Sequence, residues 1–175
     1  MRDYKEFYRE AKGDLPRIYC DMDGVLCDFI VQAKKATGVI FTQDKAKEHW
    51  DVIKKYPKFW SNMPWMPGGK QLWNYINKYK PHILSAYTIE DPNCIPGKNT
   101  WLRRNVSIST SNINLVRRKD KQKFAMKSSG TRQPAILIDD FKRNVDQFKA
   151  AGGIGIHHTS TSKTISELKR LGFDK

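Results

Sequence analysis

Two acidic residues stand directly after a short apolar run near the start of the chain. Asp21 and Asp23 follow Ile18-Tyr19-Cys20, and Gly24 comes immediately after them. Two acidic residues are unfavourable inside a buried strand, and a surface turn does not require the apolar run that precedes them. The pattern therefore predicts a strand that delivers both carboxylates to the carboxyl edge of a sheet, where open α/β folds bind ligands. Carboxylates held this close repel each other, and Mg²⁺, which favours oxygen ligands, is suited to keep both ionised.

Three later apolar runs also lead to reactive groups, and the strands of a parallel sheet deliver such groups to one edge. Carboxylates gathered there can hold Mg²⁺, while a hydroxyl and an ammonium can hold the oxygens of a phosphate. The combination allows catalysis by a carboxylate nucleophile through an aspartyl-phosphate. The groups that follow these runs are the hydroxyl of Ser85, the ammonium of Lys121 and the carboxylates of Asp139 and Asp140.

Each of these signals is weak when it is taken alone. An Asp-x-Asp pattern also occurs in glycosyltransferases and in turns, and an Asp pair is common at helix N-caps. Ser85 could be any small residue that closes a strand. Lys121 is one of six basic residues between Arg117 and Lys127, where a solvated surface is the ordinary explanation. The ordered combination of all four signals is far less expected by chance.

Strand-like and helix-like segments alternate along most of the chain, which predicts an α/β fold with a Rossmann-like parallel sheet covered by helices on both faces. The stretch 30–79 breaks the alternation. It is rich in Lys, Trp and Phe and contains no strand-like run, so we expect a small helical cap at 30–79 and a core domain at 1–29 and 80–175. A Thr164-x-x-Glu167 spacing resembles a helix capping box. Further strands are expected at 81–85, 113–116, 135–138 and 154–158, and helices at 1–13, 98–105, 121–127, 144–151 and 164–171.

Composition limits the class of protein and its partners. The chain has 175 residues, of which 39% are hydrophobic and 29% charged, as in globular proteins rather than disordered ones. No apolar run is long enough to span a bilayer and the N-terminus does not resemble a signal peptide, so a cytoplasmic location without membrane contact is expected. The net charge of +14 favours phosphorylated or polyanionic partners, although a solvated surface explains it as well as nucleic-acid contact does. The three cysteines match no zinc or redox spacing and are expected to be reduced.

The four signals together resemble the motifs of the haloacid dehalogenase-like phosphohydrolases. The run Asp21-Met22-Asp23-Gly24-Val25-Leu26 is similar to their first motif. Ser85 falls where the second motif has Ser or Thr, Lys121 matches the lysine of the third, and Asp139-Asp140 match the fourth. The resemblance covers about residues 17–173 and implies a Mg²⁺-dependent phosphohydrolase.

A closer resemblance is to the 5'(3')-deoxyribonucleotidases, which share the extended first motif Asp-Met-Asp-Gly-Val-Leu-x-Asp-Phe. The chain departs from that family at the second motif, where it has Ser85-Ala86-Tyr87 in place of Thr-Ser-Pro. Residues of that motif contact phosphate and sugar in the family. The other matching positions are Asp28-Phe29, Phe59-Trp60 followed by Pro67-Gly68, the Cys94, Lys98, Trp101 spacing, and Lys119-Asp120-Lys121.

The resemblance implies a role for each matched residue. Asp21 attacks phosphorus, and Asp23 protonates the leaving oxygen and later deprotonates water. Ser85 and Lys121 neutralise the phosphoryl oxygens. The metal site is implied to comprise Asp21, the backbone carbonyl of Asp23, Asp139 and, in its outer sphere, Asp140. The substrate-binding residues are implied to include the aromatic rings of Phe29 and Trp60, on which a base stacks, and Lys98, which either reaches a phosphate or faces water.

The function expected is therefore a Mg²⁺-dependent phosphomonoesterase that hydrolyses nucleoside monophosphates, deoxy ones above all, at the 5' or 3' position. An alternative keeps the chemistry and moves it to phosphorylated DNA or RNA ends, or to another small phosphorylated metabolite. A receiver domain is disfavoured, because its acid pair comes first and its phosphorylated Asp stands alone on a later strand. A catalytically dead nucleic-acid-binding module is disfavoured because every acidic position is retained. The sequence predicts no oligomeric state.

Overall fold

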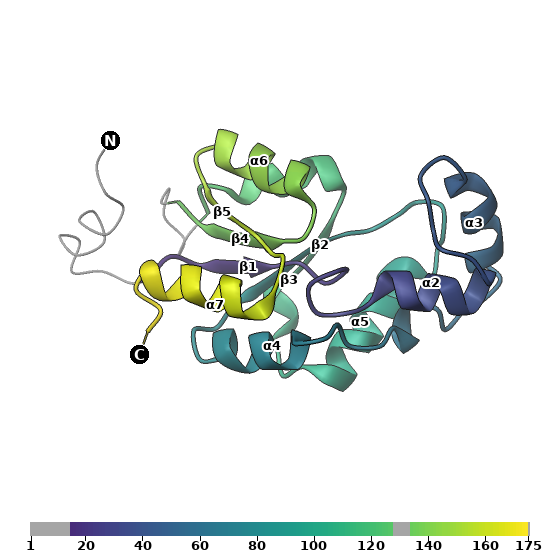
Figure 1. The fold of residues 1–175 in the computed structure, drawn as a ribbon, viewed down its shortest axis with the longest axis horizontal. Coiled ribbons are helices and arrows are strands. Elements are labelled where there is room, and N and C mark those ends of the chain that lie inside the picture. Colours follow the sequence, from purple (N-terminus) through teal and green to yellow (C-terminus); the bar gives the residue numbers. More distant parts are fainter. Residues whose placement is uncertain (1–14, 128–133, 175) are drawn as a thin grey trace.

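The computed structural model describes residues 15–127 and 134–174, and its centre is a five-stranded sheet in which every pair of strands is parallel (Figure 1). The order across the sheet is β3-β2-β1-β4-β5, so the first strand in the sequence lies in the middle. All five expected strands are present within one residue or so of their predicted bounds, which confirms the α/β class. The strands are β1 (Ile18–Cys20), β2 (His82–Ala86), β3 (Ile113–Val116), β4 (Ile136–Asp139) and β5 (Ile154–His157).

Helices cover both faces of the sheet, as predicted for strands buried on two sides. In Figure 1, α6 lies on one face, while α4 and α7 lie on the other. The expected helix around 121–127 is present as the 3₁₀ segment η3, which packs against α6. None of the described helices is long and apolar enough to cross a membrane. The helical elements are α2 (Phe29–Thr37), α3 (Ala46–Ile53), η1 (Trp60–Asn62), α4 (Gly69–Asn77), α5 (Cys94–Asn105), η2 (Thr110–Asn112), η3 (Arg118–Phe124), α6 (Lys142–Ala150) and α7 (Thr161–Arg170).

The two faces of the sheet carry separate hydrophobic clusters, because neighbouring strand residues point in opposite directions. Tyr19 and Leu137 pack with Phe148 of α6 on one face. Ile18 and Cys20, the neighbours of Tyr19, belong to the larger cluster on the other face, which includes residues of α4, α5 and α7. All three residues of β1 are buried, so the apolar run before Asp21 anchors the acids from both sides.

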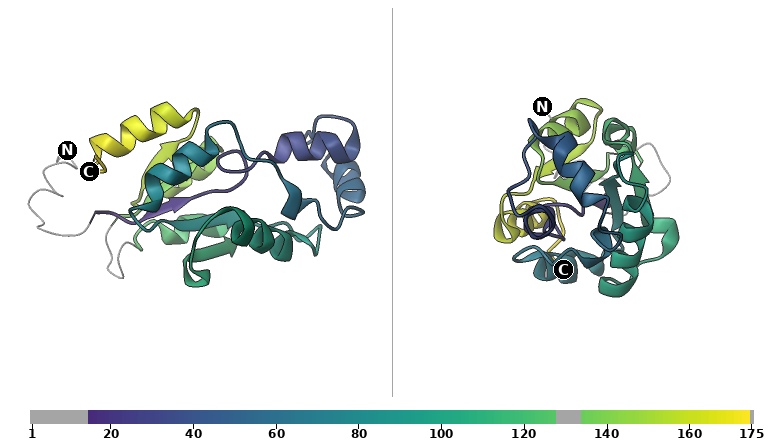
Figure 2. Two further views of the ribbon diagram at one scale, coloured as in Figure 1. Left: turned by 90° about the horizontal axis from the view of Figure 1, so that it is seen from below. Right: turned by 90° about the vertical axis from the view of Figure 1, so that its right-hand side faces the viewer.

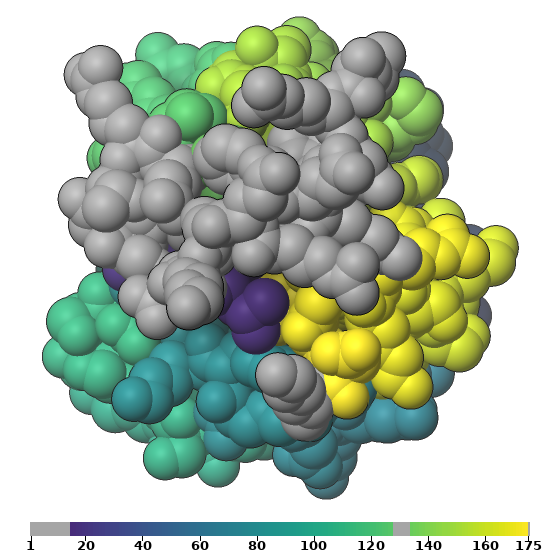
Figure 3. All heavy atoms as spheres, turned by 90° about the vertical axis from the view of Figure 1, so that its left-hand side faces the viewer, coloured from purple at the N-terminus to yellow at the C-terminus, as the bar shows by residue number. Residues whose placement is uncertain are grey.

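The segment 30–79 is helical, and its elements lie in two places. The left view of Figure 2 shows α2 and α3 at the end of the molecule away from the termini. In contrast, α4 contacts α7 and contributes Leu72 and Ile76 to the large core cluster. Figure 3, seen from the end where the sheet begins, shows the blue-green surface of this region beside the yellow C-terminal residues. The division into a cap and a core at residues 30 and 79 stays a prediction.

The predicted capping box at Thr164 is wrong. Helix α7 begins at Thr161 and is capped by Ser160, whose Oγ accepts a hydrogen bond from the amide of Lys163 at 3.4 Å. Thr164 is fully buried in the helix, and its hydroxyl is hydrogen-bonded to Nδ1 of His158 at 2.8 Å. The Thr-x-x-Glu spacing therefore falls within the helix, where Thr164 is buried and Glu167 is half-buried. The helix expected at 1–13 lies outside the described residues.

Candidate active site

The site begins with the tight turn that follows β1. The amide of Asp21 donates to the carbonyl of Ile138 at 2.9 Å, which continues the pairing of β1 with β4 by one residue. The chain then turns around the carbonyl of Met22, which accepts from the amides of the next turn residues, including Leu26 at 2.8 Å. The Asp21 side chain is locked from within, because its Oδ1 accepts from the amide of Met22 at 2.8 Å.

Gly24 is required by this turn for two reasons. Its φ of 76° lies in the left-handed region that glycine adopts without strain. A Cβ at this position would also overlap the carboxylate of Asp140. The glycine after the two acids thus lets the turn approach the end of β4.

Replacing Gly24 by Ala is expected to cost about 1–2 kcal/mol of unfolding free energy through left-handed strain, and to weaken Mg²⁺ binding by displacing Asp140. Gly38→Ala is the matched control, since Gly38 has nearly the same φ of 75° and no atom within 4 Å of its added Cβ. Urea unfolding and Mg²⁺ titration separate the two effects. Equal Mg²⁺ affinity in both variants would contradict the expectation that Gly24 leaves room for Asp140 to bind the metal.

Three carboxylates converge at the carboxyl ends of β1 and β4. Asp21, Asp139 and Asp140 each place one oxygen within 4.8 Å of the others. Asp139 is fully buried, and its Oδ1 accepts from the amide of Phe141 at 2.9 Å while Asn144 Nδ2 donates to its Oδ2 at 3.0 Å. These contacts fix the direction of the Asp139 carboxylate toward Asp21.

The converging charges make the cluster a fitting site for a cation. Partial burial, followed by the charges of Asp21 and Asp139, raises the pKa of Asp140 to about 7, although the residue as a whole is exposed to solvent. Burial and the charge of Asp21 likewise raise the pKa of Asp139. A set of oxygen donors whose ionised forms are disfavoured in this way suits Mg²⁺, which binds few carboxylates and keeps several waters.

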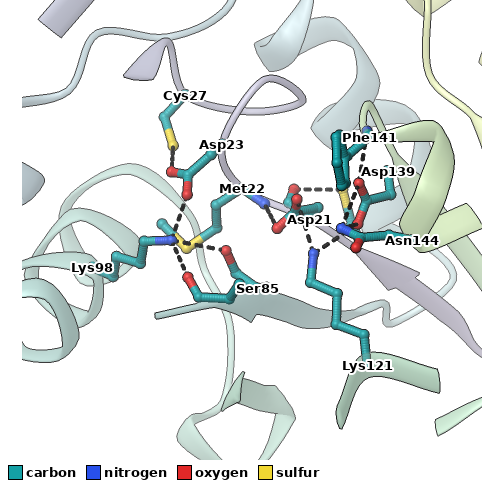
Figure 4. A network of polar contacts seen from close by, with 12 residues as sticks. Asp21, Met22, Asp23, Cys27, Ser85, Lys98, Lys121, Asp139, Phe141 and Asn144 are labelled. Carbon is teal, nitrogen blue, oxygen red and sulfur yellow. Dashed lines mark hydrogen bonds and ion pairs between the residues drawn. The ribbon is translucent and has the colours of Figure 1, made fainter. Parts of the chain in front are cut away.

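Lys121 lies beside the same acids. Its Nζ is 2.7 Å from Asp139 Oδ2 and 3.0 Å from Asp21 Oδ2, and the side chain is only 2% exposed. Burial works against the ammonium, but the adjacent carboxylates of Asp21 and Asp139 outweigh it, so the pKa of Lys121 is raised. A permanent positive charge is thus fixed next to the expected nucleophile, as Figure 4 shows.

The carboxylate of Asp23 points to a second buried lysine instead of the cluster (Figure 4). Lys98 of α5 donates to Asp23 Oδ2 at 2.6 Å, to Ser85 Oγ at 3.0 Å and to the carbonyl of Ala86 at 2.7 Å. Lys98 and Ser85 are fully buried, so the lysine does not face water. Burial opposes the charge of Lys98, but Asp23 above all other neighbours overcomes it and raises the pKa of the lysine. Lys98 therefore ties the first motif to the second.

A cavity of about 850 Å³ opens above the acids. Phe29 lies in its wall, with its ring against those of Phe41, Trp50 and Trp60. Trp60 also lines the cavity but is only 2% exposed, because its Nε1 donates to Asp91 at 2.7 Å and the Lys98 ammonium lies 5.3 Å from its ring centroid. The rings of Trp50 and Trp60 are stacked with centroids 6.0 Å apart.

The structure places the predicted polar site residues in two groups, and the predicted aromatic residues Phe29 and Trp60 in the cavity wall. Asp21, Asp139, Asp140 and Lys121 form the first group, and Asp23, Ser85 and Lys98 the second. Sequence reasoning did not single out further side chains that line the cavity, although the aromatic content of the cap and the basic cluster after β3 were signals for them. These side chains are Phe41, Trp50, Tyr87, Arg117, Arg118, Phe141 and Asn144.

Comparison with known proteins places the fold. No protein-family model and no curated protein matches this chain. Among solved structures, a hydrolase from Pseudomonas syringae is 17% identical with a TM-score of 0.53, covering 90% of each chain. A hydrolase from Streptococcus pneumoniae TIGR4 is 11% identical with the same TM-score, covering 90% of this chain and all of its own. A protein titled "Putative beta-phosphoglucomutase from Bacteroides vulgatus" is 15% identical with a TM-score of 0.60, covering 97% of this chain and 93% of its own. Over nearly its whole length, the chain shares the α/β fold of these proteins.

Proposed function

We propose that the protein is a Mg²⁺-dependent phosphomonoesterase of the haloacid dehalogenase-like type, acting on nucleoside monophosphates and above all on deoxyribonucleoside 5'- or 3'-monophosphates. One observation carries the proposal. The carboxylates of Asp21, Asp139 and Asp140 converge beside Lys121, and Asp21, Asp140 and Lys121 line a cavity whose walls carry several aromatic rings. A bound Mg²⁺ together with the Lys121 ammonium would suit a phosphate group, and the aromatic rings would suit a nucleotide base.

Asp21, Asp139 and Asp140 would hold Mg²⁺, together with the backbone carbonyl of Asp23. When bound, the metal supplies positive charge that neutralises a phosphoryl oxygen. The protein adds the ammonium of Lys121 on the other side of Asp21, at 3.0 Å from its Oδ2. Ser85 is fully buried and does not line the cavity, and its Oγ accepts from Lys98, so its part would be to hold Lys98 beside Asp23.

In the first step a carboxylate oxygen of Asp21 forms a bond to phosphorus while the bond from phosphorus to the nucleoside oxygen breaks. Asp23 must enter this step protonated, and the substrate phosphate, which carries an acidic proton near neutral pH, can supply that proton on binding. Asp23 then delivers the proton to the leaving oxygen, so the nucleoside departs as an alcohol. In the second step Asp23 takes a proton from water, the water oxygen bonds to phosphorus, and the bond to Asp21 breaks. Inorganic phosphate is released and both aspartates return to their initial states.

The aromatic wall is proposed to hold the base. Phe29 and Trp50 present partly exposed rings to the cavity, and the buried Trp60 supports them from behind. Stacking on such rings contributes about 1–3 kcal/mol per base and tolerates different bases. This arrangement favours nucleotides over small phosphorylated metabolites without an aromatic ring.

A screen of phosphate release from nucleoside and deoxynucleoside monophosphates, with and without Mg²⁺, tests the proposal. Ribose 5-phosphate and a phosphorylated aliphatic alcohol are the matched substrates without a base. We expect release that depends on Mg²⁺ and is fastest for deoxynucleotides. Release from none of these compounds would overturn the proposed function, and equal rates with and without a base would overturn its nucleotide part.

Mg²⁺ binding is expected to weaken as the pH falls through about 7. Asp140, whose pKa is raised to about 7, carries a proton below that pH and an ionised carboxylate above it, so the metal must displace the proton in acid. Between pH 8 and pH 6 the dissociation constant should rise by up to about tenfold. Calorimetric titration at several pH values measures this change. Asp140→Asn should bind Mg²⁺ more weakly and with a flatter dependence on pH, and an unchanged pH profile in that variant would contradict the assignment.

A further inference from the structure

Two arginines that have no part in the proposed hydrolysis line the same cavity. Arg117 follows β3, Arg118 begins η3, and both side chains are exposed at the cavity rim. Lys121 of the same segment is already committed to Asp21 and Asp139, at 3.0 and 2.7 Å. The two guanidinium groups are therefore additional positive charge around the substrate space.

Neither guanidinium forms an ion pair within the described residues, although the charge of Arg117 is felt by Asp120, which is itself paired with Lys123. All ion pairs there involve lysines, and neither arginine side chain donates a hydrogen bond to another described residue. Each lies against an aromatic ring of the cavity instead. Arg117 is 6.0 Å from the ring centroid of Tyr87, and Arg118 is 4.8 Å from that of Phe141. A guanidinium that is stacked but unpaired keeps its donors available for bidentate binding of a phosphate.

Both arginines start at the β3 edge of the sheet, but their guanidinium groups diverge. That of Arg117 lies against Tyr87, which follows β2, and that of Arg118 lies against Phe141, which follows β4. Asp21 follows the central strand β1, whereas Arg117 follows the edge strand β3, two strands away. Two strand spacings amount to about 10 Å between the backbones, and a long arginine side chain covers part of that distance. Arg117 is thus placed for an anion beside the phosphate that is hydrolysed, and Arg118 adds positive charge to the same cavity on the side of β4.

We propose that Arg117 and Arg118 form a subsite for a second phosphate of the substrate. The proposal rests on the proposed function and narrows its substrate class to nucleotides that carry a phosphate besides the scissile one. Such a phosphate belongs either to a free nucleoside bisphosphate or to the next linkage of a single strand with a phosphorylated end. Exposed apolar residues on the same rim, Ile89 at 65% and Phe141 at 43%, offer surface to a neighbouring sugar or base.

Steady-state hydrolysis of three substrates tests the subsite: a deoxynucleoside 5'-monophosphate, its 3',5'-bisphosphate, and the 5'-phosphorylated dinucleotide. We expect kcat/KM to be about tenfold or more higher for at least one of the two-phosphate substrates, as one charged hydrogen-bonded contact provides. The Arg117→Gln/Arg118→Gln variant should bring that ratio close to one. The variant Lys119→Gln/Lys123→Gln removes the same charge from the same segment outside the cavity and should keep the ratio of the wild type.

Each outcome has a defined meaning. A higher kcat/KM for the bisphosphate alone would identify a free nucleotide as the substrate. A higher kcat/KM for the dinucleotide would identify the end of a nucleic-acid strand, and this preference should shrink with added salt. Equal kcat/KM for all three substrates, or a preference that survives loss of both arginines, would overturn the subsite. If no substrate releases phosphate, the proposed hydrolysis fails separately. The subsite is then judged by tryptophan fluorescence titration of Asp21→Asn protein, where equal affinities for monophosphate and bisphosphate would reject it.

Discussion

Asp21→Asn is expected to lower kcat for phosphate release by at least about 10³-fold while the protein stays folded. The amide has nearly the same shape as the carboxylate but no longer provides the anionic oxygen that attacks phosphorus. With its oxygen still accepting from Met22, the amide turns its NH2 toward Lys121, so the lysine loses its 3.0 Å partner on this side but keeps its 2.7 Å contact with Asp139. Kinetics with saturating Mg²⁺ and thermal unfolding of the same preparation measure the two properties.

Asp28→Asn is the matched control for this substitution. Asp28 lines the same cavity, but its carboxylate caps α2 by accepting from the amide of Val31 at 2.9 Å. Asn caps helices about as well as Asp, so activity and stability should both stay close to those of the wild type. If Asp21→Asn retained wild-type turnover, or if both variants lost activity equally, Asp21 would not be the nucleophile.

The sheet and its acidic edge could be predicted from the sequence because both follow from local pattern. Short apolar runs separated by helix-like segments leave few alternatives to a parallel sheet. Residues that directly follow such strands must then meet at one edge, so Asp21, Ser85 and Asp139 could be assigned to one site without knowledge of the packing. The strand order was not needed for this inference, since every central position leads to the same edge.

The direction of side chains on helices could not be predicted in the same way. Whether Lys98 points to water or to Asp23 depends on how α5 packs, and Gly97 allows that packing by admitting the side chain of Trp60 where a Cβ would collide. The aromatic residues posed the same difficulty. Five Trp and eight Phe occur in the chain, and residue type alone does not separate those that face the cavity from those of the core. Trp50 lines the cavity, whereas Trp101 of α5 is buried in the core. The error at Thr164 has this origin too, because a spacing of three residues fits a helix interior as well as its cap.

Lys98→Met is expected to lower the free energy of unfolding by about 3 kcal/mol, in the range found when one partner of a buried ion pair is removed. Methionine fills a similar volume, so the loss reflects charge and hydrogen bonding rather than a cavity. The Asp23 carboxylate, whose side chain is 30% exposed, would lose its counter-charge at 2.6 Å. Ser85 Oγ and the carbonyl of Ala86 would lose their shared donor in a place where water has little access. Urea unfolding at pH 8 measures the change.

A double-mutant cycle with Asp23→Asn separates the ion pair from the other contacts of Lys98. If the pair carries the effect, Asp23→Asn/Lys98→Met should be less destabilised than the sum of the single variants, because the charge left behind by one substitution is removed by the other. Turnover adds an independent readout. Lys98 contacts the proposed acid and base but does not line the cavity, so Lys98→Met should reduce kcat through a misdirected Asp23 and change KM much less. A variant with wild-type kcat, or with single-variant effects on stability that simply add, would show that Lys98 fills space beside Asp23 without positioning it.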